Sequence, residues 1–148
     1  MIPYFTQERP ESCVPACLRM VLASMGADTT EEALYLSCET DIDGTLPSKA
    51  VQCAQSLGFN ASSPRLSGLD ELYEQIALSH SYPIVFVNLS PILGINVIHA
   101  VIVETIDREV GNISPKISGA GHNTKLTATP NALPPQLRTK LKASAAFC

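Results

Sequence analysis

The chain has 148 residues, of which 45% are hydrophobic and 16% are charged, and its formal net charge is -4. A chain of this length fits one compact domain, which buries roughly two thirds of the surface that the unfolded chain exposes. The apolar content excludes a largely disordered protein, and the negative charge argues against nucleic acid as a partner.

The charge is distributed unevenly. Residues 1–109 carry 14 acidic and five basic residues, a net charge of -9, whereas residues 110–148 carry five basic residues and no acidic one, a net charge of +5. From Pro115 onward, small residues, proline and lysine dominate without a sustained apolar period. We therefore predict a folded domain over residues 1–115 and a basic, mostly disordered tail over residues 116–148.

Apolar residues recur at helical spacing in four segments of the N-terminal half. The first segment is the strongest, because Ser12 can cap it and Gly26 follows its last apolar position. In the second, Glu31 suits the positive end of the helix dipole, and Ala33, Leu34 and Leu36 are expected to face the core. The four predicted helices start near Ser12, Thr30, Leu46 and Ser67.

The pattern changes after the fourth helix. Runs rich in valine and isoleucine at Ile84–Leu89, Val97–Ile106 and, more weakly, Glu109–Ile113 predict an antiparallel sheet. Helices followed by strands predict an α+β domain, with N-terminal helices packed on a C-terminal sheet. Residues 83–103 lack charged side chains, as a membrane span would, but Ser90-Pro91 interrupts the run, so we favour two buried strands and no membrane span.

The number and spacing of the cysteines limit which metal sites and disulfide bonds the chain can form. Five cysteines, an odd number, lack the paired CxxC spacing of a structural zinc site. Neither a disulfide framework nor a secretory signal is indicated, so we expect a cytoplasmic protein with reduced thiols. No cofactor or metal is predicted, and the sequence has no glycine-rich phosphate-binding loop.

Three side chains from separate segments could form a hydrolytic site. Cys13 follows the predicted cap of the first helix, where backbone N–H groups and the helix dipole can lower the pKa of a thiol. Gln7 precedes it by six residues, so its amide could join the backbone N–H of Cys13 in binding an oxyanion. His99 lies near the start of a predicted strand that could hold an imidazole beside the thiol. Each residue alone has a structural alternative, because a single cysteine or histidine is more often part of the core.

These residues belong to a longer pattern. It comprises Tyr4-Phe5-Thr6-Gln7, then Ser12-Cys13-Val14-Pro15-Ala16-Cys17 opening a helix that ends at Gly26, then Asp43-Gly44-Thr45, and finally His99-Ala100-Val101-Ile102-Val103. Over residues 3–107 the sequence resembles the papain-like cysteine peptidases of the bacteriocin-processing, double-glycine-cleaving family.

The resemblance implies a papain-like fold and hydrolysis of peptide bonds through a thioester. It implies Cys13 as the nucleophile, His99 as the general base and Gln7 as the oxyanion donor, without a cofactor. The substrate would be a peptide or protein, with double-glycine leader peptides as candidates. Because related domains are often fused to an export transporter, association with a separate transporter is a further implication.

The sequence departs from the family where an aspartate would orient the imidazole. Family members have an Asp-Pro step on the strand after the histidine, and Ser114-Pro115 occupies that place. In a hairpin that turns at Ile106-Asp107, facing residues have numbers summing to about 213, so His99 would face Ser114 and lie diagonally from Asn112. We therefore predict Asn112 or Ser114 as a neutral orienting residue, which stabilises an imidazolium less than a carboxylate does. The alternative is that the family's final strands are missing and the sheet is incomplete at the C-terminus.

Two other functions stay open. The chain could be an inactive relative that binds peptides in the same cleft, because a fold does not guarantee an activity. Cys13 and Cys17 share one helical face and could serve redox or metal chemistry, although no second ligand pair accompanies them. Faster labelling of Cys13 by iodoacetamide than of Cys38 or Cys53 would indicate an activated nucleophile.

Overall fold

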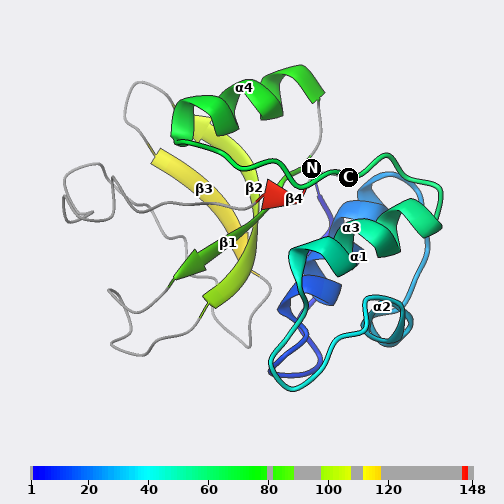
Figure 1. Ribbon diagram of the computed structural model, residues 1–148. Coiled ribbons are helices and arrows are strands. Elements are labelled where there is room, and N and C mark those ends of the chain that lie inside the picture. Colours follow the sequence, from blue (N-terminus) through cyan, green and yellow to red (C-terminus); the bar gives the residue numbers. More distant parts are fainter. Residues whose placement is uncertain (1, 80–81, 89–97, 108–111, 118–144, 147–148) are drawn as a thin grey trace.

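The computed structural model describes residues 2–79, 82–88, 98–107, 112–117 and 145–146 (Figure 1). Within these residues the helices are α1 (Cys13–Ser24), α2 (Glu31–Ser37), α3 (Pro47–Ser56) and α4 (Leu69–Ser79). The strands are β1 (Ile84–Asn88), β2 (Ile98–Asp107), β3 (Asn112–Ile117) and β4 (Ala145–Ala146). Helices precede the main strands, so the predicted α+β class is confirmed.

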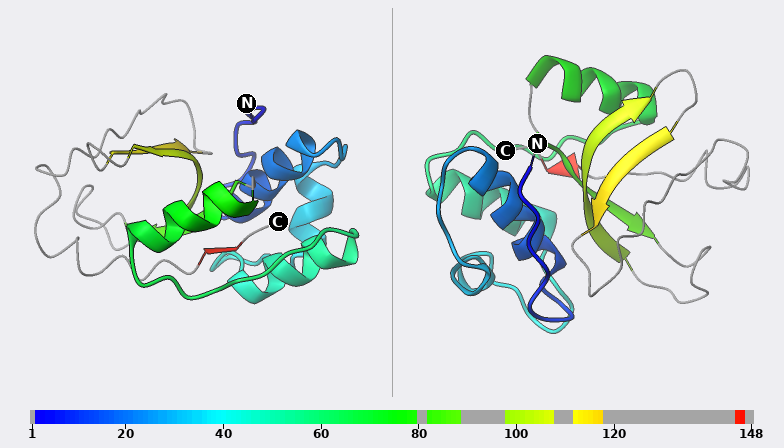
Figure 2. Two further views of the ribbon diagram at one scale, coloured as in Figure 1. Left: turned by 90° about the horizontal axis from the view of Figure 1, so that it is seen from above. Right: turned by 180° about the vertical axis from the view of Figure 1, so that it is seen from behind.

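The strands form one antiparallel sheet in the order β3-β2-β1-β4. Helices α1, α2 and α3 gather on one side of this sheet, whereas α4 lies apart from them (Figure 1 and Figure 2). Alternate residues of β1 and β2 enter two separate cores, because successive side chains of a strand point to opposite faces. Ile84, Ala100 and Ile102 pack with the core of α1, α2 and α3, and Val85, Val101 and Val103 pack with the core that includes Leu72 of α4.

Helices α1, α2 and α3 end with one residue in the left-handed conformation. These residues are Gly26, with a φ of 85°, Glu39, with a φ of 51°, and Gly58, with a φ of 89°. After α1, the N–H of Ala27 donates to the carbonyl of Leu22, which closes the helix in a Schellman motif. Gly26 takes this conformation without a steric cost, whereas a residue with a Cβ atom, such as Glu39, does not.

The inward face of α2 differs from the predicted one. Leu34 is buried as expected, but Ala33 is exposed, Leu36 is 68% exposed and Glu31 is only 2% exposed. The predictions for Ala33 and Leu36 are therefore wrong. The place of Leu36 in the helix turns it away from α1, whereas Glu31 lies one turn before Leu34 on the buried side.

The end of the sheet also differs from the prediction. β3 begins at Asn112 rather than Glu109 and continues to Ile117, two residues beyond the predicted end of the domain. β4 lies within the predicted tail and pairs with Ile84 and Val85 of β1. The prediction of disorder for residues 118–144 falls outside the described residues.

Candidate active site

Cys13 is the first residue of α1 and is partly buried where this helix meets β2. Backbone hydrogen bonds from Ala100, Val14 and Cys13 itself reach its thiol. The amide nitrogen of Ala100 is two covalent bonds from the α-carbon of His99. The fold therefore brings the segment of the predicted nucleophile and the segment of the predicted base together.

A second cysteine of α1 also contacts β2. Cys17 lies one turn below Cys13, is fully buried, and contacts the carbonyl oxygen of Ala100 through its Sγ atom at 3.5 Å. The backbone of Ala100 thus meets both cysteines of α1. Cys17 is a core residue through which α1 packs against β2.

His99 is the second residue of β2, is half-buried, and lies opposite Val87 of β1. The alternation of β2 puts it in the row of Val101, whereas Ala100 belongs to the row that faces α1. This alternation directs the side chains of His99 and Ala100 to opposite faces of β2. The role of His99 as the general base stays a prediction.

The electrostatic environment of Cys13 differs from the one expected at a helix start. Burial raises the pKa of the Cys13 thiol, and the backbone hydrogen bonds from Ala100, Val14 and Cys13 lower it by less. The first turn of the helix thus lowers this pKa as expected, through the N–H groups of Val14 and Cys13, but burial outweighs it and the net direction is upward. An activated thiolate needs a further cation, and the imidazolium of His99 is the candidate beside Ala100.

Gln7 lies in the loop that leads into α1. Its side-chain amide nitrogen donates to the carbonyl of Arg9 and, at 2.8 Å, to the carbonyl of Pro10. An amide nitrogen has two N–H bonds, so both are engaged within the loop. Gln7 can bind an oxyanion only after it releases one of these carbonyls, and its oxyanion role stays a prediction.

The register of the β2–β3 hairpin contradicts the predicted one. Ser114 pairs with Thr105, and Asn112 pairs with Asp107. Thr105 is six residues and Asp107 eight residues from His99, which corresponds to about 20 Å and about 26 Å at about 3.3 Å per residue. The predicted contacts of His99 with Ser114 and Asn112 are therefore wrong.

The reason for the error lies in the turn and in the strand. From Thr105 to Asp107 the numbers of paired residues sum to 219 rather than 213, so the hairpin turns about three residues later than assumed, and the register shifts again between Val103 and Thr105. A displaced turn and a bulge both move every later pair. Neither feature is visible in the alternation of apolar residues.

Four cysteines lie among the described residues. Cys13, Cys17, Cys38 and Cys53 are thiols that form no disulfide bond. In the described part of the chain, no three side chains of His, Cys, Asp or Glu gather as they would around a metal ion. Over the same ranges, no helix has the length and apolar character needed to cross a membrane. Among the described residues, a metal ion bound by Cys13 and Cys17 would thus find no third ligand of these types.

Comparison with known proteins decides the family. The family model described as "Peptidase C39 family" matches residues 1–113, which include Gln7, Cys13 and His99. The chain belongs to the peptidase C39 family. This membership confirms the resemblance identified from the sequence. No curated protein sequence matches the chain significantly.

Solved structures show the fold of this C39 family member. One is a double-glycine motif protease from an AMS/PCAT transporter, crystallised in complex with the leader peptide. It has 18% sequence identity to this chain and a TM-score of 0.66, and the match covers 99% of this chain and 91% of the protease. The peptidase domain of Streptococcus ComA, a bifunctional ABC transporter of a quorum-sensing pathway, has 16% identity and a TM-score of 0.68, covering 100% and 97%. A C39-like peptidase from Bacillus anthracis has 12% identity and a TM-score of 0.70, covering 99% and 94%. The papain-like peptidase fold is thus confirmed.

Sequence reasoning missed the contact between Ser12 and Glu31. Ser12 precedes α1 as predicted, but its side chain makes no capping hydrogen bond to the helix. Its Oγ atom instead contacts the carbonyl of Arg9, at 2.9 Å, and the carboxylate of Glu31. One signal was available, because Glu31, Leu34 and Cys38 follow the spacing of a single buried helix face.

Proposed function

We propose that this C39 family member is a cysteine peptidase that hydrolyses a peptide bond through a thioester. The observation that carries the proposal is the junction of α1 and β2, where the thiol of Cys13 meets the backbone of the residue after His99. Family membership supports the same class of reaction. Cys13 is the proposed nucleophile, His99 the general base and Gln7 the oxyanion donor.

The proposed reaction has two stages. His99 removes the thiol proton of Cys13, and the sulfur attacks the substrate carbonyl carbon. The backbone N–H of Cys13 and the amide of Gln7, once released from its loop, stabilise the oxyanion. The imidazolium returns its proton to the leaving amine, which leaves a thioester. Water deprotonated by His99 then attacks the thioester, and the carboxylate product and the thiol are released.

The proposed substrates are double-glycine leader peptides. Two proteins of the same fold support this choice, since one is a double-glycine motif protease crystallised with a leader peptide and the other is a peptidase domain of an ABC transporter. We extend the substrate class to this chain, with a separate export transporter as partner. The proposal includes a cytoplasmic location, because a thiolate nucleophile must stay reduced.

Mass spectrometry of a leader-peptide panel tests the proposal. Incubation with the protein in heavy-oxygen water should yield a fragment ending in the two glycines, with one heavy oxygen in its new carboxylate. Cys13→Ala should yield none. Cys53→Ala, which removes a buried thiol of α3, is the matched control and should retain cleavage. Absence of cleavage by the wild type, or equal cleavage by Cys13→Ala, would reject the proposal.

A peptide-binding module without activity is the second candidate. Two observations favour it, because burial raises the pKa of Cys13 and both N–H bonds of the Gln7 amide are engaged within its loop. This candidate predicts equal calorimetric affinity of the wild type and Cys13→Ala for a leader peptide, with no cleavage by either. Cleavage by the wild type alone would exclude it.

A further inference from the structure

A buried carboxylate holds the loop between Gln7 and Cys13 against α2. Glu31, the first residue of α2, is 2% exposed. Its Oε1 atom accepts a hydrogen bond from the backbone N–H of Glu8 at 2.8 Å and another from the hydroxyl of Ser12. Both donors belong to the loop. One carboxylate oxygen therefore ties the two ends of this segment to the helix.

Ser12 extends the network through the turn. The N–H of Arg9 donates to Ser12 Oγ at 3.1 Å, and the N–H of Ser12 donates to the carbonyl of Arg9 at 3.2 Å. The same Arg9 carbonyl accepts the amide of Gln7. Glu31 thus acts on the position of Gln7 through Ser12 and Arg9.

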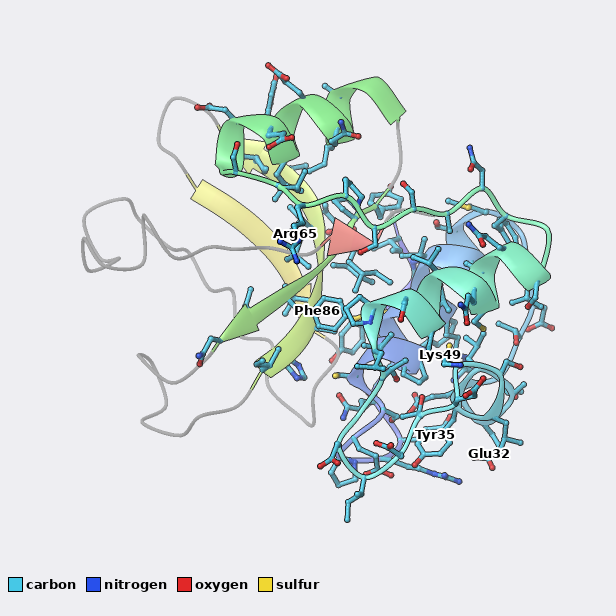
Figure 3. All side chains as sticks on the ribbon, in the orientation of Figure 1. Glu32, Tyr35, Lys49, Arg65 and Phe86 are labelled. Carbon is cyan, nitrogen blue, oxygen red and sulfur yellow. The ribbon has the colours of Figure 1, made fainter. Side chains whose placement is uncertain are left out.

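The remaining contacts of the loop with α2 are more exposed. Arg9 pairs with Glu32 and stands over the ring of Tyr35, 4.5 Å from its centroid, and the Tyr35 hydroxyl donates to Glu11 at 3.1 Å. Figure 3 shows Glu32 and Tyr35 together on α2. Exposed ion pairs contribute little to stability, whereas a buried hydrogen bond has no water to replace it. Glu31 is therefore the contact on which the position of the loop depends most.

We propose that Glu31 is a positioning residue for peptide-bond hydrolysis. By fixing the loop, its carboxylate sets where the backbone that carries Gln7 lies relative to the N–H of Cys13, so that the Gln7 amide can join this N–H at the oxyanion once it releases one loop carbonyl. The inference rests on the proposed peptidase activity and adds a residue that touches neither the substrate nor the thiol. A displacement of about 1 Å in such a site can reduce turnover about 100-fold, so loss of Glu31 should act on kcat.

Two substitutions of similar size test the role of the acceptor oxygen. Glu31→Met keeps the length of the side chain but removes its oxygen atoms, whereas Glu31→Gln keeps one acceptor. Oε2 of Glu31 has no hydrogen-bond partner among the described residues, so the glutamine nitrogen can take its place without breaking a bond. Glu31→Met should lower kcat by about 10-fold to 100-fold with KM within about threefold, and Glu31→Gln should keep kcat within about threefold. Glu39→Gln, which alters an exposed carboxylate paired with Lys49, is the matched control and should leave kcat unchanged.

Two more measurements separate positioning from loss of the fold. Thermal denaturation establishes that Glu31→Met is folded at the assay temperature. Alkylation of Cys13 by iodoacetamide forms no oxyanion, so its rate should stay within about threefold while hydrolysis falls. An unchanged kcat in Glu31→Met, an equal loss in Glu31→Gln, or a parallel loss of alkylation and hydrolysis overturns the proposal.

Amide hydrogen exchange distinguishes failure of this inference from failure of the proposed function. The N–H groups of Glu8 and Arg9 bond to Glu31 and Ser12, so Glu31→Met should speed their exchange at least about tenfold, and Glu31→Gln should not. Unchanged exchange in Glu31→Met overturns the role of Glu31 even in an active peptidase. A wild type that cleaves no peptide, with faster exchange in Glu31→Met, rejects the peptidase proposal and supports the contact between Glu31 and the loop.

Discussion

The pH dependence of Cys13 alkylation tests whether His99 activates the thiol. Burial raises the pKa of Cys13, and the backbone hydrogen bonds from Ala100, Val14 and Cys13 offset this only in part. The substitution His99→Ala leaves that environment without an imidazolium. Alkylation of His99→Ala should therefore rise with pH around a midpoint above about 8.5, the ordinary value for a cysteine thiol.

The expected size of the difference follows from the charge of the pair. In the wild type, an imidazolium at His99 should lower the midpoint of Cys13 relative to that of His99→Ala, because a cation beside the sulfur favours the thiolate. The two midpoints should then differ by at least about one pH unit, and each unit corresponds to about 1.4 kcal/mol of interaction between imidazolium and thiolate. The thiolate is the reactive form, so loss of the cation moves the rate profile to higher pH.

The assay is iodoacetamide labelling from about pH 5 to about pH 10, a range that includes the ordinary value for a thiol, followed by mass spectrometry of the peptide that contains Cys13. The other described cysteines are buried and serve as slowly labelled internal references. Glu39→Gln, which removes an exposed charge paired with Lys49, is the control and should keep the wild-type profile. Superimposable profiles of the wild type and His99→Ala, or a wild-type midpoint above the ordinary thiol value, would refute the pairing of thiol and imidazole.

Three further predictions concern stability and one carboxylate. Leu22→Ala, in the buried face of α1, should lower the free energy of unfolding by about 2 to 5 kcal/mol. Leu36→Ala, at 68% exposure, should lower it by less than about 0.5 kcal/mol. Equal losses of the two variants in urea denaturation would contradict the described burial. Gly26→Ala should lower the free energy of unfolding by about 1 kcal/mol, because the φ of 85° at this position disfavours a residue with a Cβ atom. The added Cβ atom would meet nothing within 4 Å, so the cost comes from the backbone conformation alone. An unchanged urea midpoint would show that this end of α1 relaxes. Hydrogen bonds from the backbone N–H and the hydroxyl of Ser67 lower the pKa of Glu71, so the NMR titration midpoint of Glu71 should lie below about 4.3. Ser67→Ala removes only the hydroxyl and should raise this midpoint part of the way toward the ordinary value. A midpoint unaffected by Ser67→Ala would exclude the hydroxyl contact. Since the folded pKa is the lower one, the stabilising contribution is complete above about pH 4.3 and is lost as pH falls through the folded pKa.

Local sequence signals predicted most helix ends and the two central strands. Gly26 and Gly58 end their helices in the left-handed conformation that glycine takes readily. The boundaries of β1 and β2 lie within one residue of the predicted ones, because strands covered on both faces are continuous apolar runs. The end of α2 at Glu39 could not be predicted in the same way, because a residue with a Cβ atom seldom adopts positive φ.

Tertiary contacts decided the parts that the sequence did not predict. A glutamate at the start of a helix ordinarily lies in water beside the helix dipole. Glu31 is buried because two donors from a distant loop fold onto its carboxylate. Similarly, the partner of Ser114 depends on where the hairpin turns and on a register shift, which act over the whole hairpin. The proposed trio of Gln7, Cys13 and His99 could be named from spacing and family resemblance, whereas the proposed positioning role of Glu31 could not.

Burial of Cys13 has opposite effects on its reactivity, depending on the charge of His99. Without a cation, the apolar surroundings favour the neutral thiol and raise its pKa. With an imidazolium beside the sulfur, the same low-dielectric surroundings strengthen the attraction between the two charges. Reactivity should then depend on how firmly the imidazole is held. Because the register removes Asn112 and Ser114 from this task, the orientation of His99 is what separates an active peptidase from a peptide-binding relative of the same fold.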